Sequence, residues 1–151
     1  MAATALLIRD PRPEDEAQWR RLWAAYCAFY ETAVNEEVTE ATWRRLFAPG
    51  SGIFGRIAEW RGTVAGFTVS VLHPGSWTIT PICYLEDLFV DPGARGRGIG
   101  RALIEDLVQR GREQGWSHIY WHTRQSNDAA RRLYDAFATA DDFVRYRIFL
   151  D

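Results

Sequence analysis

A loop rich in glycine and arginine, Arg95 to Arg101 (RGRGIGR), carries the clearest chemical signal in the sequence. It follows an apolar run that ends in Asp91-Pro92, and a helical pattern begins directly after it. The first turn of a helix leaves backbone N–H groups unpaired, and the helix dipole adds roughly half a positive charge there. Glycines let the backbone approach a ligand closely, and arginines add positive charge. The loop is therefore predicted to bind phosphate groups.

Two common phosphate-binding loops do not fit this stretch. A P-loop requires a lysine after its last glycine, and the sequence contains no lysine. A dinucleotide-binding loop requires G-x-G-x-x-G in the first βα turn, whereas Gly96, Gly98 and Gly100 follow at every second residue, about two-thirds along the chain. The spacing that remains is Arg95-x-x-Gly98-x-Gly100. A solvated turn that binds no ligand is the alternative interpretation.

This spacing, placed after an apolar run that ends in Phe89-Val90, resembles the pyrophosphate loop of the GNAT superfamily of acetyl-CoA-dependent N-acetyltransferases. The resemblance is strongest over residues 84–134 and weak over the first 50. It implies that the loop binds the pyrophosphate of acetyl-CoA. The residues to which this role is carried over are Arg95, Gly96, Arg97, Gly98, Ile99, Gly100 and Arg101.

Asn127 and Tyr134 lie about two helical turns apart, so they share one side of a predicted helix. In GNAT enzymes the matching helix flanks the cofactor. The resemblance implies that Asn127 contacts the pantetheine arm and that Tyr134 protonates the departing thiolate. A phenol with an unperturbed pKa of about 10 keeps its proton at neutral pH. The alternative is a helix-capping asparagine and a core tyrosine.

Glu86 stands beside Asp87 in an apolar run that is expected to be a strand. Successive strand residues point to opposite faces, so at most one of these carboxylates is expected in a given cleft. A carboxylate near the thioester could accept the proton of an incoming amine. The segment Tyr84 to Asp87 resembles that of diamine and polyamine acetyltransferases, in which the glutamate has this role, so Glu86 is the predicted base. The alternative is an edge-strand acid or an ion-pair partner.

In the family, the strand that carries this acid separates from its neighbour at a β-bulge. The resemblance implies that backbone N–H groups near the bulge bind the pantetheine arm and polarise the thioester carbonyl. The residues at these positions are Leu88, Phe89 and Val90.

Aromatic and acidic side chains gather in the N-terminal half, which covers the acceptor pocket in GNAT enzymes. Aromatic faces beside carboxylates suit a cationic amine. The candidate acceptor-binding residues are Tyr26, Tyr30, Glu31 and Asp87. Aromatic residues at helical spacing can instead form core, which is the interpretation preferred for Trp19, Trp23 and Trp43.

Ten elements in the order β-α-α-β-β-β-α-β-α-β are expected to position these residues. The predicted strands are 4–9, 53–60, 63–72, 77–90, 116–123 and 143–150, and the predicted helices are 13–31, 39–48, 99–110 and 127–137. This order matches the GNAT fold. The expected class is α/β (α+β), with a mixed, mostly antiparallel central sheet flanked by helices, and residues 1–151 are expected to form a single domain.

The composition argues against several other classes of protein. A net charge of −2 argues against nucleic-acid binding, and no apolar run approaches the roughly 20 residues of a membrane span. The N-terminus lacks the features of a signal peptide, so a cytoplasmic location is expected. His118 and His122 would lie about 13 Å apart on a strand, so no metal site is predicted.

The sequence thus predicts an enzyme that transfers an acetyl group from acetyl-CoA to a primary amine of a small molecule. The amine is expected to attack directly within a ternary complex. Two alternatives stay open: acetylation of a protein amine, and a non-catalytic acyl-CoA-binding sensor. Because GNAT relatives often pair, a homodimer is possible. Residues 135–142 lack the glycine turn that often follows the family's tyrosine, which leaves the shape of the acceptor pocket open.

Overall fold

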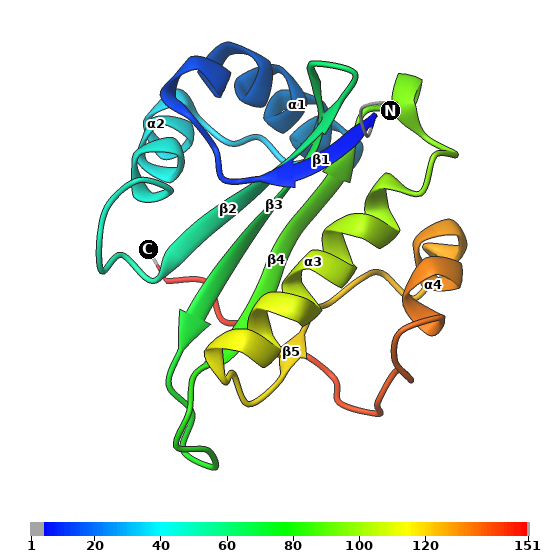
Figure 1. Cartoon of the computed structure of the whole chain (residues 1–151). Helices are drawn as coiled ribbons and strands as arrows, with labels where there is room; N and C mark the ends of the chain where they lie inside the picture. The colour runs from blue at the N-terminus through cyan, green and yellow to red at the C-terminus, as the bar shows by residue number, and fades with distance from the viewer. Residues whose placement is uncertain (1–4, 151) are drawn as a thin grey trace.

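The computed structural model describes residues 5–150 and contains a five-stranded sheet whose strands lie side by side in chain order. Strands β1 to β4 are antiparallel, and β5 runs parallel to β4 (Figure 1). The strands are β1 Leu6–Arg9, β2 Ile53–Trp60, β3 Thr63–His73, β4 Ile82–Val90 and β5 Ile119–Tyr120. The helices are α1 Glu16–Phe29, α2 Glu36–Arg45, α3 Ile99–Gln114 and α4 Asp128–Asp135.

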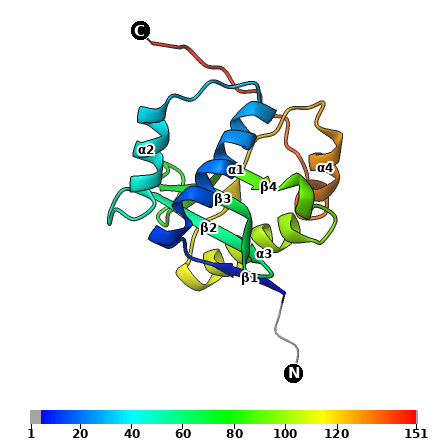
Figure 2. The same cartoon turned by 90° about the horizontal axis from the view of Figure 1, so that it is seen from above.

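Helices cover both faces of this sheet. Figure 2 shows α1 and α2 on one face and α3 on the other, and α4 packs beside α3 through Leu133 and Tyr134. The face under α1 carries the larger aromatic core, in which Trp19 and Trp23 stack with ring centroids 5.1 Å apart. Trp43 is buried in the same cluster, so the prediction that these tryptophans form core is confirmed.

Local signals explain most element boundaries. The two-residue turn Arg61-Gly62 has positive φ at both positions, which suits the predicted hairpin between β2 and β3. Helix α2 begins at Glu36, three residues before the predicted start, because the Asn35 side chain caps it by accepting a hydrogen bond from the Val38 N–H (2.8 Å). The predicted start at residue 39 was therefore wrong.

Strand β4 is shorter than the predicted strand 77–90. The hairpin between β3 and β4 closes at the pair His73 and Ile82, so the preceding residues have no strand partner. Trp77 and Ile79 accordingly lie exposed in the connecting loop. The predicted strand 116–123 is likewise reduced to Ile119–Tyr120.

The predicted last strand, 143–150, is not a strand in the structure. These residues form an exposed tail, and residues 144–150 make no hydrogen bond to any part of the chain between residues 5 and 150. A β-strand needs a neighbouring strand to satisfy its backbone groups, and the tail has none here. Residue 4, the predicted start of the first strand, lies outside the described residues.

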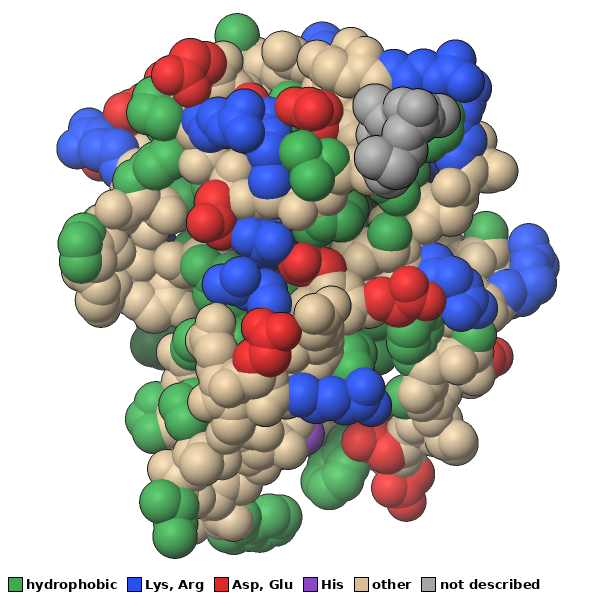
Figure 3. All heavy atoms as spheres, viewed as in Figure 1, with side chains coloured by type: hydrophobic (Ala, Val, Ile, Leu, Met, Phe, Trp, Pro, Cys, Tyr) green, Lys and Arg blue, Asp and Glu red, His purple; other side chains and the backbone are tan. Residues whose placement is uncertain are grey.

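The surface over α3 mixes both signs of charge (Figure 3). Arg56, on β2, pairs with Asp106 on α3 at an Nε–Oδ2 distance of 2.9 Å, which connects the helix to the sheet. Within residues 5–150, no helix is long and apolar enough to cross a membrane.

Candidate active site

The predicted phosphate loop leads from β4 into the N-terminus of α3. Gly96 and Gly98 adopt positive φ values of 81° and 75°, which favour glycine, and Gly98 is the N-cap of α3. Among residues 5–150, no side chain caps this helix end, and a Cβ at either glycine would meet no atom within 4 Å. The first-turn N–H groups therefore have no side-chain partner, and the surrounding space is open to a ligand.

Gly100 has a different environment from the other two glycines. A Cβ at this position would lie 3.1 Å from the Leu133 side chain on α4. Gly100 therefore lets α4 approach α3 closely, which fixes the position of the helix that carries Tyr134.

The loop arginines are held mainly by backbone carbonyls and aromatic rings. Arg95 donates to the Val90 carbonyl (3.3 Å) and Arg97 donates to the Gly93 carbonyl (3.0 Å). Neither forms an ion pair with any acid among the described residues, whereas Arg101 pairs with Glu105 (3.4 Å). The positive charge of Arg95 and Arg97 is thus available to an anionic ligand at the loop.

An opening between β4 and β5 starts directly after Tyr84. The two strands pair only at Cys83 with Ile119 and at Tyr84 with Tyr120. Beyond that point β4 has no strand partner on its β5 side within residues 5–150, and this stretch contains Leu88, Phe89 and Val90. The predicted separation of the two strands is therefore present.

A β-bulge in β4 separates the two adjacent acids. Val69 pairs with Asp87 but the next residue, Ser70, pairs with Leu85, so Glu86 is the extra residue of the bulge. Glu86 is exposed, whereas Asp87 lies on the α1 face and its Oδ1 accepts a hydrogen bond from the Tyr26 hydroxyl (2.7 Å). The sequence alone does not show this bulge.

Among the acids at the site, Asp87 has the most strongly shifted pKa. Burial raises the pKa of Asp87 to about 7; the hydrogen bond from Tyr26 opposes this shift, and the charge of Glu86 adds to it. Burial, and then the charge of Asp87, raise the pKa of Tyr26 as well. Asp87 can therefore change its charge near neutral pH.

Asn127 and Tyr134 are placed by α4, on the far side of the opening. Asn127 is the N-cap of α4, its Oδ1 accepting from the Ala130 N–H (3.3 Å), so the capping interpretation is confirmed. Burial raises the pKa of Tyr134 to about 12, and its ring packs edge-on against Trp121. Within residues 5–150 its hydroxyl has no hydrogen-bond partner, so a protonated phenol is available.

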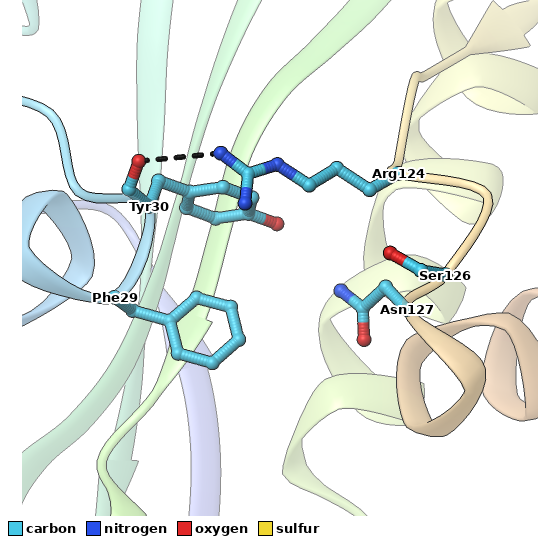
Figure 4. A pocket seen from close by; sticks show the side chains of 5 residues that line it. All are labelled: Phe29, Tyr30, Arg124, Ser126 and Asn127. Atoms are coloured by element: carbon cyan, nitrogen blue, oxygen red, sulfur yellow. Dashed lines mark hydrogen bonds between the residues drawn. The ribbon is translucent and has the colours of Figure 1, made fainter.

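A cavity of about 230 Å³ lies between the end of α1 and the start of α4 (Figure 4). The Arg124 guanidinium crosses it, donating to the Tyr30 carbonyl (3.4 Å) and lying 5.6 Å from the Tyr30 ring. Its lining residues are Phe29, Tyr30, Arg124, Ser126 and Asn127. The Tyr30 ring also packs against the Tyr26 ring, whose hydroxyl is hydrogen-bonded to Asp87. The cavity and Asp87 are therefore connected through these two tyrosines.

The structure brings most predicted site residues together, but not all of them. Glu31 is exposed, has a positive φ of 53°, and does not line the cavity. Arg124 and Ser126 were missed by sequence reasoning. The only available signal was their place between a predicted strand and the capping Asn127. No group of three or more His, Cys, Asp or Glu side chains among the described residues could hold a metal.

Comparison with known proteins identifies the family. Residues 17–138 match the sequence profile of the acetyltransferase (GNAT) family. The chain belongs to the GNAT acetyltransferase family. It is 33% identical over 149 residues to the D-amino-acid N-acetyltransferase HPA3 of Saccharomyces cerevisiae, covering 97% of this chain and 92% of that protein. The predicted family, fold and enzyme class are thereby confirmed.

Solved GNAT structures share the same fold. The ribosomal-protein-alanine N-acetyltransferase of Brucella melitensis biovar Abortus 2308 has a TM-score of 0.81 at 24% identity, covering 97% of this chain and all of that chain. The aminoglycoside N-acetyltransferase AAC(6')-Iy, in complex with CoA, has a TM-score of 0.80 at 20% identity, covering 97% of each chain. These two proteins, one named for a protein acceptor and one for an aminoglycoside, thus share the fold of this chain.

Proposed function

We propose that this protein transfers the acetyl group of acetyl-CoA to the primary amine of an amino acid. The observation that carries the proposal is the opening between β4 and β5. It has a β4 segment with no partner on its β5 side within residues 5–150, Asp87 against Tyr26 on one side, and Tyr134 beside α3 on the other. The acceptor class is inferred from the charges near this opening. Asp87 and Glu86 are acidic and suit an ammonium group, and Arg124 is basic and suits a carboxylate.

The phosphate loop holds the cofactor in this proposal. The open N-terminus of α3 and the unpaired Arg95 and Arg97 suit the pyrophosphate. Asn127 at the head of α4 contacts the pantetheine arm. The backbone of Leu88 to Val90 faces the thioester, where N–H groups polarise its carbonyl. GNAT enzymes use acetyl-CoA, and the fold relative AAC(6')-Iy has been solved with CoA.

The chemical step requires two proton transfers. The bound ammonium first loses one proton to solvent, because only the neutral amine has a lone pair. The amine nitrogen then attacks the thioester carbon, the C–N bond forms, and Glu86 takes the second proton that the nitrogen loses. The C–S bond breaks and the leaving thiolate takes the proton of the Tyr134 hydroxyl. Solvent then exchanges the two protons, which returns both side chains to their starting states. The acetyl group passes directly to the amine, so no acyl-enzyme forms.

The acceptor side matches a zwitterion. An ammonium group suits Asp87, Glu86 and the rings of Tyr26 and Tyr30. A carboxylate suits Arg124, which forms no ion pair with an acid in residues 5–150. The relative HPA3 is a D-amino-acid N-acetyltransferase, which supports this acceptor class.

A protein amine is the second candidate acceptor. The fold relative from Brucella melitensis acetylates a ribosomal-protein alanine, and an exposed acceptor side with Phe29 at its rim would admit a peptide. Membership in an enzyme family speaks against a non-catalytic sensor. A cytoplasmic location and a homodimer stay predictions at this point.

An acceptor panel tests the proposed class. The release of free thiol from acetyl-CoA would be followed with D- and L-amino acids, their methyl esters, the matching decarboxylated amines, and short peptides. Free amino acids are expected to react fastest, because only they carry a carboxylate on the same carbon as the amine, where Arg124 is proposed to bind it. Equal rates for acids and esters would contradict the class, and reaction with peptides alone would favour the second candidate.

Substitution of Arg124 identifies the carboxylate site. Arg124→Met keeps much of the side-chain length but removes the charge, so KM for an amino acid is expected to rise about 10- to 100-fold. KM for its methyl ester is expected to change little. The matched control is Arg132→Met on α4, an exposed arginine outside the cavity lining, which should change neither value. Equal losses for acid and ester would contradict the assignment.

A further inference from the structure

The α1 face of the sheet carries a group of aromatic side chains to which the proposed reaction assigns no task. They come from the end of β3, from β4 and from the segment around β5, and we call them the aromatic cluster: His73, Tyr84, His118, Tyr120 and His122. Leu85 is buried under α3, so its neighbour Tyr84 points to the opposite face, which is the face of Asp87. Two of the histidines, His118 and His122, are exposed and the other three residues are half-buried. The cluster is therefore open to a ligand.

The cluster stands at the closed end of the opening between β4 and β5. Tyr84 and Tyr120 are the last paired residues of the two strands, and their rings stack with centroids 4.9 Å apart and planes 12° apart. Because this stack runs across the strands, the ring edges point along the strands, including toward the opening. His122 follows Tyr120 by two residues, and its ring stands at 72° to that of Tyr84 and at 83° to that of Tyr120. His122 is thus the member of the cluster nearest the opening.

Hydrogen bonds within the cluster occupy both tyrosine hydroxyls. The Tyr120 hydroxyl is bonded to His73 Nε2 (2.8 Å), and the Tyr84 hydroxyl is bonded to His122 Nδ1 (3.3 Å). These bonds hold the rings in place and leave mainly ring carbon and hydrogen atoms for contact with a further molecule. The cluster therefore suits an apolar ring better than a side chain that needs hydrogen bonds.

The electrostatics of the cluster disfavour acidic and basic side chains for different reasons. Glu86 lies two residues beyond Tyr84 on β4, and burial, and then the charge of Glu86, raise the pKa of Tyr84. An acidic side chain would therefore meet a like charge. A cation binds best over the face of an aromatic ring, whereas here each tyrosine covers a face of the other. The ring edges carry the positive part of the ring's charge distribution, and they attract the negative face of a second aromatic ring.

We propose that the aromatic cluster binds the side chain of the acceptor and selects amino acids whose side chain is aromatic. This inference rests on the proposed function, in which the amine lies at Asp87 and Glu86 and the carboxylate lies at Arg124. Glu86 is two residues beyond Tyr84, and Arg124 is two residues beyond His122, so the two charged groups stand on opposite sides of the opening just past the cluster. A side chain on the carbon between the amine and the carboxylate is within reach of His122.

A panel of free amino acids tests the selection. Thiol release would be followed with phenylalanine, cyclohexylalanine, leucine, alanine, arginine and glutamate, each as both enantiomers. For phenylalanine, kcat/KM is expected to exceed that of alanine about tenfold or more, because the ring buries more apolar area. It is expected to exceed that of cyclohexylalanine about two- to tenfold, because only an aromatic ring has a negative face. Equal values across the panel, or the highest value for arginine, would overturn the inference and leave the proposed function in place.

His122 is the residue whose loss should change the selection most. His122→Ala is expected to lower the ratio of kcat/KM for phenylalanine to that for alanine about fivefold, and His122→Phe, which keeps a ring, is expected to retain the ratio. His118→Ala is the matched control, because it removes the same type of side chain from the other side of Tyr120, away from the opening, and should leave the ratio unchanged. An unchanged ratio in His122→Ala would contradict the role of the cluster.

Nuclear magnetic resonance tests the contact without any reaction. The probe is 3-phenylpropionate, which has the ring and the carboxylate but no amine, and 3-cyclohexylpropionate is its control. The ring current of the phenyl compound is expected to shift the imidazole proton signals of His122 more than the cyclohexyl compound does. If no amino acid is acetylated, the proposed function is wrong, and this shift alone decides the inference. Equal shifts from the two compounds, or no shift at millimolar concentration, would overturn the inference.

Discussion

Asp87 and Glu86 are neighbours in the sequence, but the β-bulge gives them different surroundings. Asp87 is half-buried and accepts a hydrogen bond from Tyr26, and Glu86 is exposed at the bulge. Burial raises the pKa of Asp87 to about 7, so this acid is partly protonated at neutral pH. Its proposed role is to bind the ammonium group, whereas Glu86 is the proposed base.

The raised pKa of Asp87 has a consequence for stability. An aspartate in the unfolded chain ionises near pH 4, and in the folded chain near pH 7. The unfolded state therefore loses its proton first as pH rises, and the free energy of unfolding should fall from about pH 4 to about pH 7. At about 1.4 kcal/mol per pKa unit, the fall is on the order of a few kcal/mol.

Asp87→Asn removes the titrating group while keeping an acceptor for Tyr26, so it is expected to flatten this pH dependence. Urea unfolding at pH 5 and pH 8 measures how the free energy of unfolding depends on pH. Glu86→Gln is the matched control: the Glu86 charge is the smallest contribution to the raised pKa of Asp87, so this variant should keep most of the pH dependence while lowering kcat. Parallel pH profiles for the wild type and Asp87→Asn would contradict the burial argument.

At the scale of elements, the site depends on how β4, α3 and α4 meet. Two glycines in the same loop have distinct tasks. Gly98 is the open N-cap of α3 with positive φ, and Gly100 gives α4 room to pack through Leu133. The sequence pattern alone treats them as equivalent parts of one phosphate loop.

Alanine substitutions are expected to separate these two tasks. Gly98→Ala strains the left-handed N-cap by about 1 kcal/mol, so KM for acetyl-CoA should rise more than kcat falls. Gly100→Ala pushes α4 away from α3, so kcat should fall because Tyr134 moves with that helix. Steady-state kinetics with varied acetyl-CoA measures both. If both variants changed the same constant equally, the assigned roles would be wrong.

The elements that local signals specify were predicted well. Apolar spacing placed α1, and the turn Arg61-Gly62 placed the β2–β3 hairpin. The start of α2 was missed because the capping side chain of Asn35 was overlooked. The bulge at Glu86 could not be read, because a bulge is defined by the partner strand rather than by its own residues.

At the scale of the whole molecule, the sequence predicted the family and sheet order but not the fate of its last strand. The tail has the composition of a strand, yet strand formation depends on an available edge, which local sequence does not specify. The cavity residue Arg124 was missed for a related reason. It meets Tyr30 only after the chain has folded, because the two lie 94 residues apart in sequence.

The central claim is that the opening between β4 and β5 transfers acetyl groups directly from acetyl-CoA to an amine. Mass spectrometry tests it most directly, on the wild type and Tyr134→Phe incubated with acetyl-CoA, with and without the amino-acid panel. We expect one N-acetylated product per free thiol released, and an unchanged protein mass when no acceptor is present. In Tyr134→Phe, kcat is expected to fall at least tenfold with little change in the affinity for acetyl-CoA. An acetylated protein intermediate, or no transfer to any amine, would contradict the claim.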